Sequence, residues 1–147
     1  MQLISRQVGD VTVLAVDGEL MVPTAPAFLR RSRLRLVSLD APLVAVDLGG
    51  VRRVDSSGFA ALVALARHVQ RRGGDVCLVG LAPEARLLLE IMQLHLLFDV
   101  CEDMTAAIEF LTANQPAPAK TVAPALGRRL LGRIGVAVSG LERRAAS

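Results

Sequence analysis

Apolar residues along the chain fall into short blocks with two kinds of spacing. The run from Leu43 to Leu48 is almost continuously apolar, which is typical of a strand that helices cover on both faces. After the polar turn at residues 54–58, apolar residues recur at helical spacing, at Phe59, Leu62, Val63, Ala66 and Val69. We therefore predict a central strand, a short turn and a helix over residues 43–70.

The residues before this unit predict a hairpin and a helix. Two β-prone runs, 2–8 and 11–16, are separated by Gly9-Asp10, a two-residue turn that tolerates positive φ. Thr24 and Pro26 then predict a helix start. The helix carries one apolar set and one basic set, namely Phe28, Leu29, Leu34, Leu36 and Val37 against Arg30, Arg31, Arg33 and Arg35. A solvated face is the simpler interpretation of the arginines, and an acidic partner is the other.

The residues after this unit predict a second strand parallel to the first. Gly73-Gly74 ends the helix, and 75–80 is another short apolar run, so a strand, a helix and a strand follow in order. Pro83 suits the first turn of a third helix, a strand at 96–100 follows, and Asp103 caps a last helix. We expect buried positions in these two helices at Leu87, Leu88 and Ile91, and at Ala107, Ile108 and Leu111.

These elements predict an α/β fold with a small mixed sheet of four to five strands and about four helices. The fold takes up residues 1–114 as one domain, because a chain of 147 residues with 52% hydrophobic content buries one core. Residues 115–124 hold three prolines and predict an extended linker. The segment 126–144 combines an apolar stripe with arginines and four glycines, which favours a flexible tail over an amphipathic helix.

Charge separates the two parts of the chain. Residues 1–114 hold 11 Lys and Arg against 13 Asp and Glu, whereas residues 115–147 hold 6 against 1, so the basic pI of about 9.6 comes from the tail. A weak contact of the tail with a membrane or another polyanion stays open. We expect no direct nucleic acid contact by the domain, because the chain has four Phe and no Trp or Tyr for base stacking.

The remaining composition argues against several other classes. No run of about 18 apolar residues predicts a membrane span, and the first six residues lack the layout of a secretory signal, so we expect a cytoplasmic protein. Cys77 and Cys101 lie in apolar surroundings without metal-ligand spacing, which favours buried small side chains over a disulfide or a metal site. No glycine-rich nucleotide loop is present, and no cofactor is predicted.

The turn Asp55-Ser56-Ser57-Gly58 lies where the central strand passes into a helix. One interpretation is a helix cap, worth about 1 kcal/mol, in which a side-chain oxygen accepts from a free N–H group. The other is a phosphorylated serine, since a helix N-terminus stabilises anions and Gly58 leaves the approach uncrowded. Catalysis is not expected, because the turn lacks a Gly-x-Ser-x-Gly motif and His68 lies about 18 Å along the helix from Ser56.

At these residues the sequence resembles the STAS domain, the sulfate transporter and anti-sigma factor antagonist module. The resemblance covers residues 3–112 and rests on these motifs: Gly18-Glu19-Leu20, Val46-Asp47-Leu48, Val54-Asp55-Ser56-Ser57-Gly58, Phe59-Ala60-Ala61-Leu62, Gly73-Gly74 and Val79-Gly80-Leu81-Ala82-Pro83. It implies the STAS fold, with a small mixed sheet flanked by helices. It also implies a role in partner switching without catalysis.

The resemblance implies an anti-sigma factor antagonist that binds an anti-sigma factor serine kinase. Ser56 matches the phosphorylated serine of the family, with Ser57 as the runner-up, and a phosphatase reverses the modification. The implied partner surface consists of the turn and its neighbours: Arg52, Arg53, Asp55, Ser56, Ser57, Gly58, and Met21 in the loop from Leu20 to Thr24. Many antagonists carry an acidic residue where this chain has Met21.

The sequence leaves two alternatives open. Arg52 and Arg53 are either solvated loop charges or partner contacts. The protein as a whole is either a phosphorylated antagonist or a non-catalytic STAS scaffold, a subunit of a larger signalling or transport-associated assembly, and an oligomer fits both.

Overall fold

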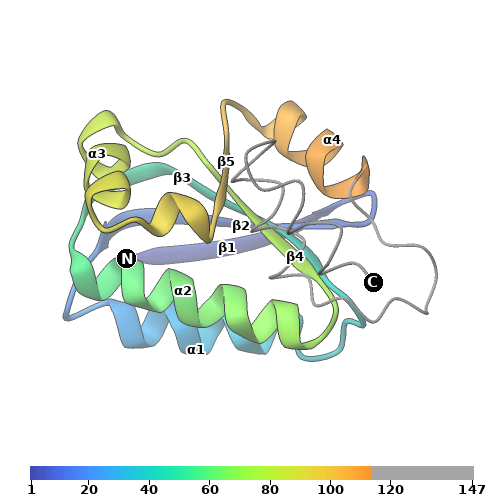
Figure 1. Ribbon diagram of the computed structural model, residues 1–147. Helices are drawn as coiled ribbons and strands as arrows, with labels where there is room; N and C mark the ends of the chain where they lie inside the picture. The colour runs from blue at the N-terminus through green and yellow to red at the C-terminus, as the bar shows by residue number, and fades with distance from the viewer. Residues whose placement is uncertain (114–147) are drawn as a thin grey trace.

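The computed structural model describes residues 1–113, in which helices lie on both faces of one five-stranded sheet (Figure 1). The strands are β1 (Gln2–Val8), β2 (Val11–Leu20), β3 (Leu43–Val54), β4 (Asp75–Val79) and β5 (Asp99–Cys101). The helices are α1 (Ala25–Leu36), α2 (Ser56–Arg71), α3 (Pro83–Ile91), the 3-10 turn η1 (Leu94–Leu96) and α4 (Met104–Ala113). The predicted α/β class with about four helices is confirmed.

The strands lie side by side in sequence order, β1-β2-β3-β4-β5. The pair β1–β2 is the predicted antiparallel hairpin, and Gly9 in its turn has φ +59°, a conformation that glycine adopts at little cost. The pairs β2–β3, β3–β4 and β4–β5 are parallel, so the prediction of a parallel pair around α2 is confirmed. The sheet is therefore mixed, with a single antiparallel strand at one edge.

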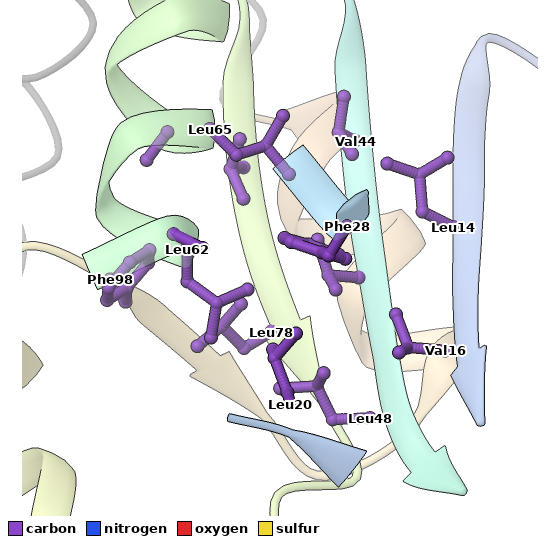
Figure 2. Packing of buried hydrophobic residues seen from close by; sticks show 14 of the residues in the cluster. Leu14, Val16, Leu20, Phe28, Val44, Leu48, Leu62, Leu65, Leu78 and Phe98 are labelled. Carbon is purple, nitrogen blue, oxygen red and sulfur yellow. The ribbon is translucent and has the colours of Figure 1, made fainter. Parts of the chain in front are cut away.

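The core has two parts because β3 is buried on both faces, as its apolar run predicts. Alternate residues Val44, Val46 and Leu48 face α1 and α2, and Leu43 and Ala45 face α4. Helices α1 and α2 run next to each other on one face of the sheet, and α4 lies on the other (Figure 1). Figure 2 shows the larger part of the core, in which helix side chains meet strand side chains: Phe28, Leu62 and Leu65 with Leu14, Val44 and Leu78.

Helix α1 buries a narrower stripe than its sequence predicts. Phe28 and Leu36 are fully buried and Leu29 is partly buried, but Leu34 and Val37 are 65% and 62% exposed. Helical spacing groups these two with the apolar set, but they lie outside the core. The physical reason is that α1 packs on α2 and on the edge of the sheet, so only one side of the helix is covered.

Two predictions in the second half of the domain need correction. In α3 the only fully buried side chain is Leu89, whereas Leu87 and Ile91 are 58% and 68% exposed, since α3 covers the end of the core with one narrow side. The predicted last strand at 96–100 exists as β5 but begins only at Asp99, since the chain first forms the turn η1 after Gln93, which has φ 60°. The cap at Asp103 is confirmed, since its Oδ1 accepts from the Ala106 N–H at 2.8 Å.

None of the helices within residues 1–113 has the length and apolar content needed to cross a bilayer. The predictions for the linker and tail, residues 115–147, lie outside the described residues. The boundary between the domain and the tail therefore stays a prediction.

Candidate functional site

Three loops meet at the end of the sheet where β2, β3 and β4 terminate, because these strands are parallel. The carboxyl ends of parallel strands point to the same edge, so the β2–α1 loop, the β3–α2 junction and the β4–α3 loop come together. The predicted turn at residues 54–58 is the central member of this group. The sequence prediction that the loop from Leu20 to Thr24 lies beside it is borne out by direct contact between the two.

Asp55 joins two of these loops through its carboxylate. Oδ1 accepts from the Gly58 N–H at 2.9 Å, which caps α2, and Oδ2 accepts from the Val22 N–H at 3.0 Å. The Asp55 N–H also donates to the Leu20 carbonyl at 3.3 Å. The capping interpretation is therefore correct for Asp55. One carboxylate fixes the start of α2 and holds the β2–α1 loop against it.

The β2–α1 loop is held from its other side by Thr24. The Thr24 hydroxyl donates to the Glu19 carbonyl at 2.7 Å and accepts from the Met21 N–H at 3.0 Å. The Thr24 and Ala25 N–H groups in turn donate to the Met21 carbonyl. Met21 is half-buried, whereas Val22 is 63% exposed. Hydrogen bonds between the loop backbone and the side chains of Asp55 and Thr24 thus position an exposed apolar side chain, that of Val22, next to the α2 N-terminus.

Gly58 is buried and serves the packing of this junction. A Cβ at this position would overlap the Leu20 carbonyl oxygen and lie 2.9 Å from Val54 Cγ1. Only glycine lets the first turn of α2 approach the end of β2 this closely. Gly58 thus has a steric role inside the fold, which the sequence interpretation did not include.

The two serines of the turn differ in exposure. Ser56, the first residue of α2, is exposed, and Ser57 is half-buried. Both lie where the N–H groups of a helix carry a partial positive charge. Because Asp55 already caps the helix, the Ser56 hydroxyl is not needed for that purpose.

Arg52 and Arg53 lie on β3 and not in a loop, since the strand continues to Val54. Beyond the end of β4 this part of β3 pairs with β2, and Glu19 stands opposite Arg53. Their side chains form an ion pair at 3.7 Å, with exposed fractions of 40% and 68%, so it contributes between about 0 and 1 kcal/mol. Arg52 is exposed as well.

A hollow of about 380 Å³ lies beside the turn and brings in residues that the sequence reasoning missed. Its lining comes from three elements: Met21, Val51, Arg52, Arg53, Val54, Ala82, Glu84, Ala85 and Leu88. The residues of α3 reach the hollow because β3 and β4 are parallel, so that α3 begins at the same end of the sheet as α2. The parallel pair was predicted, and the involvement of α3 could have been inferred from it. Val22 carries no comparable sequence signal, because its link to Asp55 spans 33 residues.

The remaining chemically active side chains lie elsewhere. Burial lowers the pKa of His68, with smaller contributions from Arg33, Arg72 and Arg71, so the ring is neutral near pH 7. Cys77 and Cys101 occupy neighbouring strands with their Sγ atoms 3.0 Å apart. Within residues 1–113 no group of three or more His, Cys, Asp or Glu side chains is arranged to hold a metal ion.

Comparison with protein families places most of the chain in one family. A family profile described as "STAS domain" matches residues 2–107. No curated protein sequence matches the chain.

Solved structures with the same fold come from several kinds of protein. An anti-sigma factor antagonist from Mycobacterium paratuberculosis is 21% identical with a TM-score of 0.68, covering 76% of this chain and 93% of that one. A putative anti-sigma factor antagonist from Thermotoga maritima is 20% identical with a TM-score of 0.70, covering 75% and 94%. The murine anion transporter Slc26a9 is 18% identical with a TM-score of 0.65, covering 74% of this chain and 19% of that one.

Proposed function

The chain belongs to the STAS domain family, and from this premise we propose that it is an anti-sigma factor antagonist whose binding is controlled by phosphorylation of Ser56. In this proposal the unphosphorylated protein binds an anti-sigma factor that is also a serine kinase, and so frees a sigma factor. The kinase supplies ATP and Mg²⁺, and a phosphatase restores binding. The protein itself catalyses no reaction and acts in the cytoplasm.

The observation that carries the proposal is the position of Ser56. It is an exposed hydroxyl at the first residue of a helix, directly after a carboxylate whose two oxygens accept from Gly58 and Val22. An exposed hydroxyl is accessible to a kinase, and the helix N-terminus offsets part of the charge of a phosphate. Ser57 is half-buried, which makes it the weaker candidate.

A phosphate on Ser56 would act on the adjoining loop as well as on the surface charge. It adds about −1.5 to −2 charge beside Asp55, whose carboxylate holds the Val22 N–H. Repulsion between the phosphate and Asp55 weakens this tether, and Val22 and Met21 lose their fixed position. We therefore infer that phosphorylation ends partner binding in two ways, by like charge and by release of the β2–α1 loop.

The partner surface in this proposal consists of the exposed residues around the turn. Ser56, Val22, Arg52 and Arg53 supply exposed side chains, with Met21, Asp55 and Ser57 at their border and Gly58 buried beneath them. The two arginines border a hollow that Glu84 also lines, so an acidic or polar side chain of the partner can enter it. We expect these arginines to speed association at low salt.

The test is the affinity for an anti-sigma factor kinase of the source organism, measured by titration calorimetry. Ser56→Asp should weaken binding at least tenfold, or about 1.4 kcal/mol. Thr105→Asp is the matched control, because Thr105 is an exposed hydroxyl in the first turn of α4, whose cap is also an aspartate, on the other face of the sheet. Equal affinity of the two variants would contradict the proposal.

The fold likeness to part of a murine anion transporter supports a second candidate, a non-catalytic STAS scaffold within a larger assembly. In that role Asp55 and Ser56 act only as a helix start. Size-exclusion chromatography of the protein with its partners separates the candidates, because a scaffold stays in the assembly when Ser56 is changed to Asp.

A further inference from the structure

Positive charge is concentrated on one side of the domain. Helices α1 and α2 hold six arginines and no Asp or Glu, whereas the other residues of 1–113 hold five arginines and thirteen Asp or Glu. Both helices lie on the same face of the sheet and pack against each other. The domain therefore carries a basic helical face and an acidic remainder, although its net charge is small.

The basic face contains a hollow with an apolar lining. The hollow measures about 390 Å³ and is formed by α1 and by one residue of α2: Pro26, Leu29, Arg30, Arg33, Leu34, Val37 and His68. Leu34 and Val37, the two exposed members of the predicted apolar set, form its apolar rim. A second hollow of about 270 Å³ lies on the other side of Arg33, between it and Arg67 and Arg71 of α2.

The arginines that line the two hollows form no ion pair within residues 1–113, and one ring nitrogen beside them has no hydrogen-bond partner there. The ion pairs in this part of the chain, Arg53 with Glu19 and Arg86 with Glu102, involve no arginine of α1 or α2. The Nε2 atom of His68 is buried at the hollow and has no hydrogen-bond partner among the described residues. Four arginines that line the two hollows, Arg30, Arg33, Arg67 and Arg71, thus carry charge that no ion pair within residues 1–113 offsets.

From this arrangement we propose that the face formed by α1 and α2 docks an acidic amphipathic helix of a protein partner. We call this surface the arginine groove, defined by Leu29, Arg30, Arg33, Leu34, Val37, Arg67, His68 and Arg71. Apolar side chains of the partner helix enter the hollow between Leu29, Leu34 and Val37. Its carboxylates pair with the arginines on both sides.

Charge decides between this occupant and the other candidates. The chain's own residues 115–147 hold six Lys and Arg against one acidic residue, so they would be repelled from the groove. A second copy that met the first through the same face would oppose arginines to arginines. An anionic membrane matches the charge, but a hollow between two helices suits a protruding side chain better than a lipid surface.

The arginine groove is separate from the proposed phosphorylation site. His68 follows Ser56 by twelve positions in α2, which corresponds to about 18 Å along the helix. A partner at the groove therefore does not require the state of Ser56 to change. The proposal goes beyond the antagonist function and is tested independently of it.

The probe is a fluorescent helical peptide of about 18 residues, with leucines along one face and glutamates along its flanks. Its fluorescence anisotropy is measured as the full-length protein is added. The test variant is Arg30→Glu with Arg33→Glu, which reverses two charges at the groove. The matched control is Arg31→Glu with Arg35→Glu, which makes the same charge change on α1 at residues that do not line the hollow. Circular dichroism verifies that both variants are folded.

We expect saturable binding that the test variant weakens at least tenfold and the control variant weakens less than threefold. A peptide of the same composition in scrambled order should bind at least tenfold more weakly, and Ser56→Asp should leave the affinity unchanged. Absence of saturable binding below about 1 mM peptide would overturn the proposal. Equal losses in both variants would reduce the effect to general charge attraction and would also overturn it.

Two further outcomes would assign the groove to another occupant and so contradict the proposal. One is retention on vesicles of phosphatidylglycerol and phosphatidylcholine that depends on Arg30 and Arg33 when the peptide does not bind. The other is self-association of the protein alone, seen by analytical ultracentrifugation, that the test variant abolishes and the control variant keeps.

Discussion

Helix α2 begins and ends in surroundings of opposite character. At its N-terminus both oxygens of Asp55 accept from backbone N–H groups, and the exposed side chain left over is the hydroxyl of Ser56. At its C-terminal end His68 has a buried Nε2 without a partner in residues 1–113, beside Arg71 and Arg33. The first end is fixed by the Asp55 bonds, whereas the second presents Arg33 and Arg71, which form no ion pair within residues 1–113.

This difference suggests how one helix can serve two kinds of contact. A switch needs a rigid frame, so that one added charge changes a defined geometry, and the Asp55 bonds supply it. A docking groove needs uncompensated charge beside apolar surface, which the C-terminal half of α2 and the neighbouring α1 provide. The following predictions test each end separately, from the largest effect to the smallest.

Gly58→Ala should cause the largest loss of stability. The added Cβ would overlap the Leu20 carbonyl and approach Val54, so the helix start must move away from β2. We expect the free energy of unfolding to fall by about 2 to 4 kcal/mol, although alanine favours a helix by about 1 kcal/mol. Urea unfolding measures this change. Gly49→Ala is the control, because its Cβ meets only the Asp47 Oδ1 atom at 3.1 Å; an equal loss there would contradict the steric account.

Asp55→Ala should lower the free energy of unfolding by about 1 to 2 kcal/mol, because the cap and the link to Val22 disappear together. Asp55→Asn should lose less, since its remaining oxygen still accepts from the Gly58 N–H. Hydrogen exchange by NMR should show faster exchange of the Val22 amide in both variants. Protection of that amide at the wild-type level would disprove the tether.

Asp55 takes part in one contact that the sequence alone could predict and one that it could not. A cap within the turn and the start of α2 are local features, so residue type and spacing indicated them, although the assignment of the cap to Asp55 comes from the structure. The same holds for the hairpin at Gly9, whose turn chemistry lies within two residues. The bond from Asp55 to Val22 joins residues 33 positions apart and exists only because two parallel strands end at one edge.

The sequence shows which residues are apolar, but it does not predict which of them other elements cover. Leu34 and Val37 satisfy helical spacing, yet α2 and the sheet cover only one side of α1, and the same limit applies to Leu87 on α3. The apolar run that predicts the central strand ends at Leu48, but β3 continues because β2 pairs with it as far as Val54. That pairing placed Arg52 and Arg53 on a strand instead of a loop.

The C-terminal end of α2 should make stability depend on pH. The pKa of His68 is lowered by burial and by Arg33, Arg72 and Arg71, so the unfolded chain binds a proton more readily than the folded one. The free energy of unfolding therefore rises with pH between the folded and the unfolded pKa of His68. The stability that comes from neutral His68 is lost as the pH falls below the unfolded value of about 6.5. His68→Gln should flatten the slope of unfolding free energy between pH 5 and 7, measured in urea. An unchanged slope would contradict the assignment.

Deletion of residues 115–147 should have the smallest effect on the fold. The described domain already contains a closed core, and the deleted residues carry mainly positive charge that the arginine groove repels. We expect the melting temperature to change by less than about 2 °C in differential scanning calorimetry. A fall above about 5 °C would indicate that these residues belong to the fold. It would also contradict the expectation that the arginine groove repels them.

The most direct measurement is intact-mass spectrometry after incubation with the cognate kinase and ATP. Our account predicts one phosphate on the wild-type protein and on Ser57→Ala, and none on Ser56→Ala, because Ser56 is the exposed hydroxyl at the fixed helix start. A phosphate that persists in Ser56→Ala and disappears in Ser57→Ala would contradict the central claim.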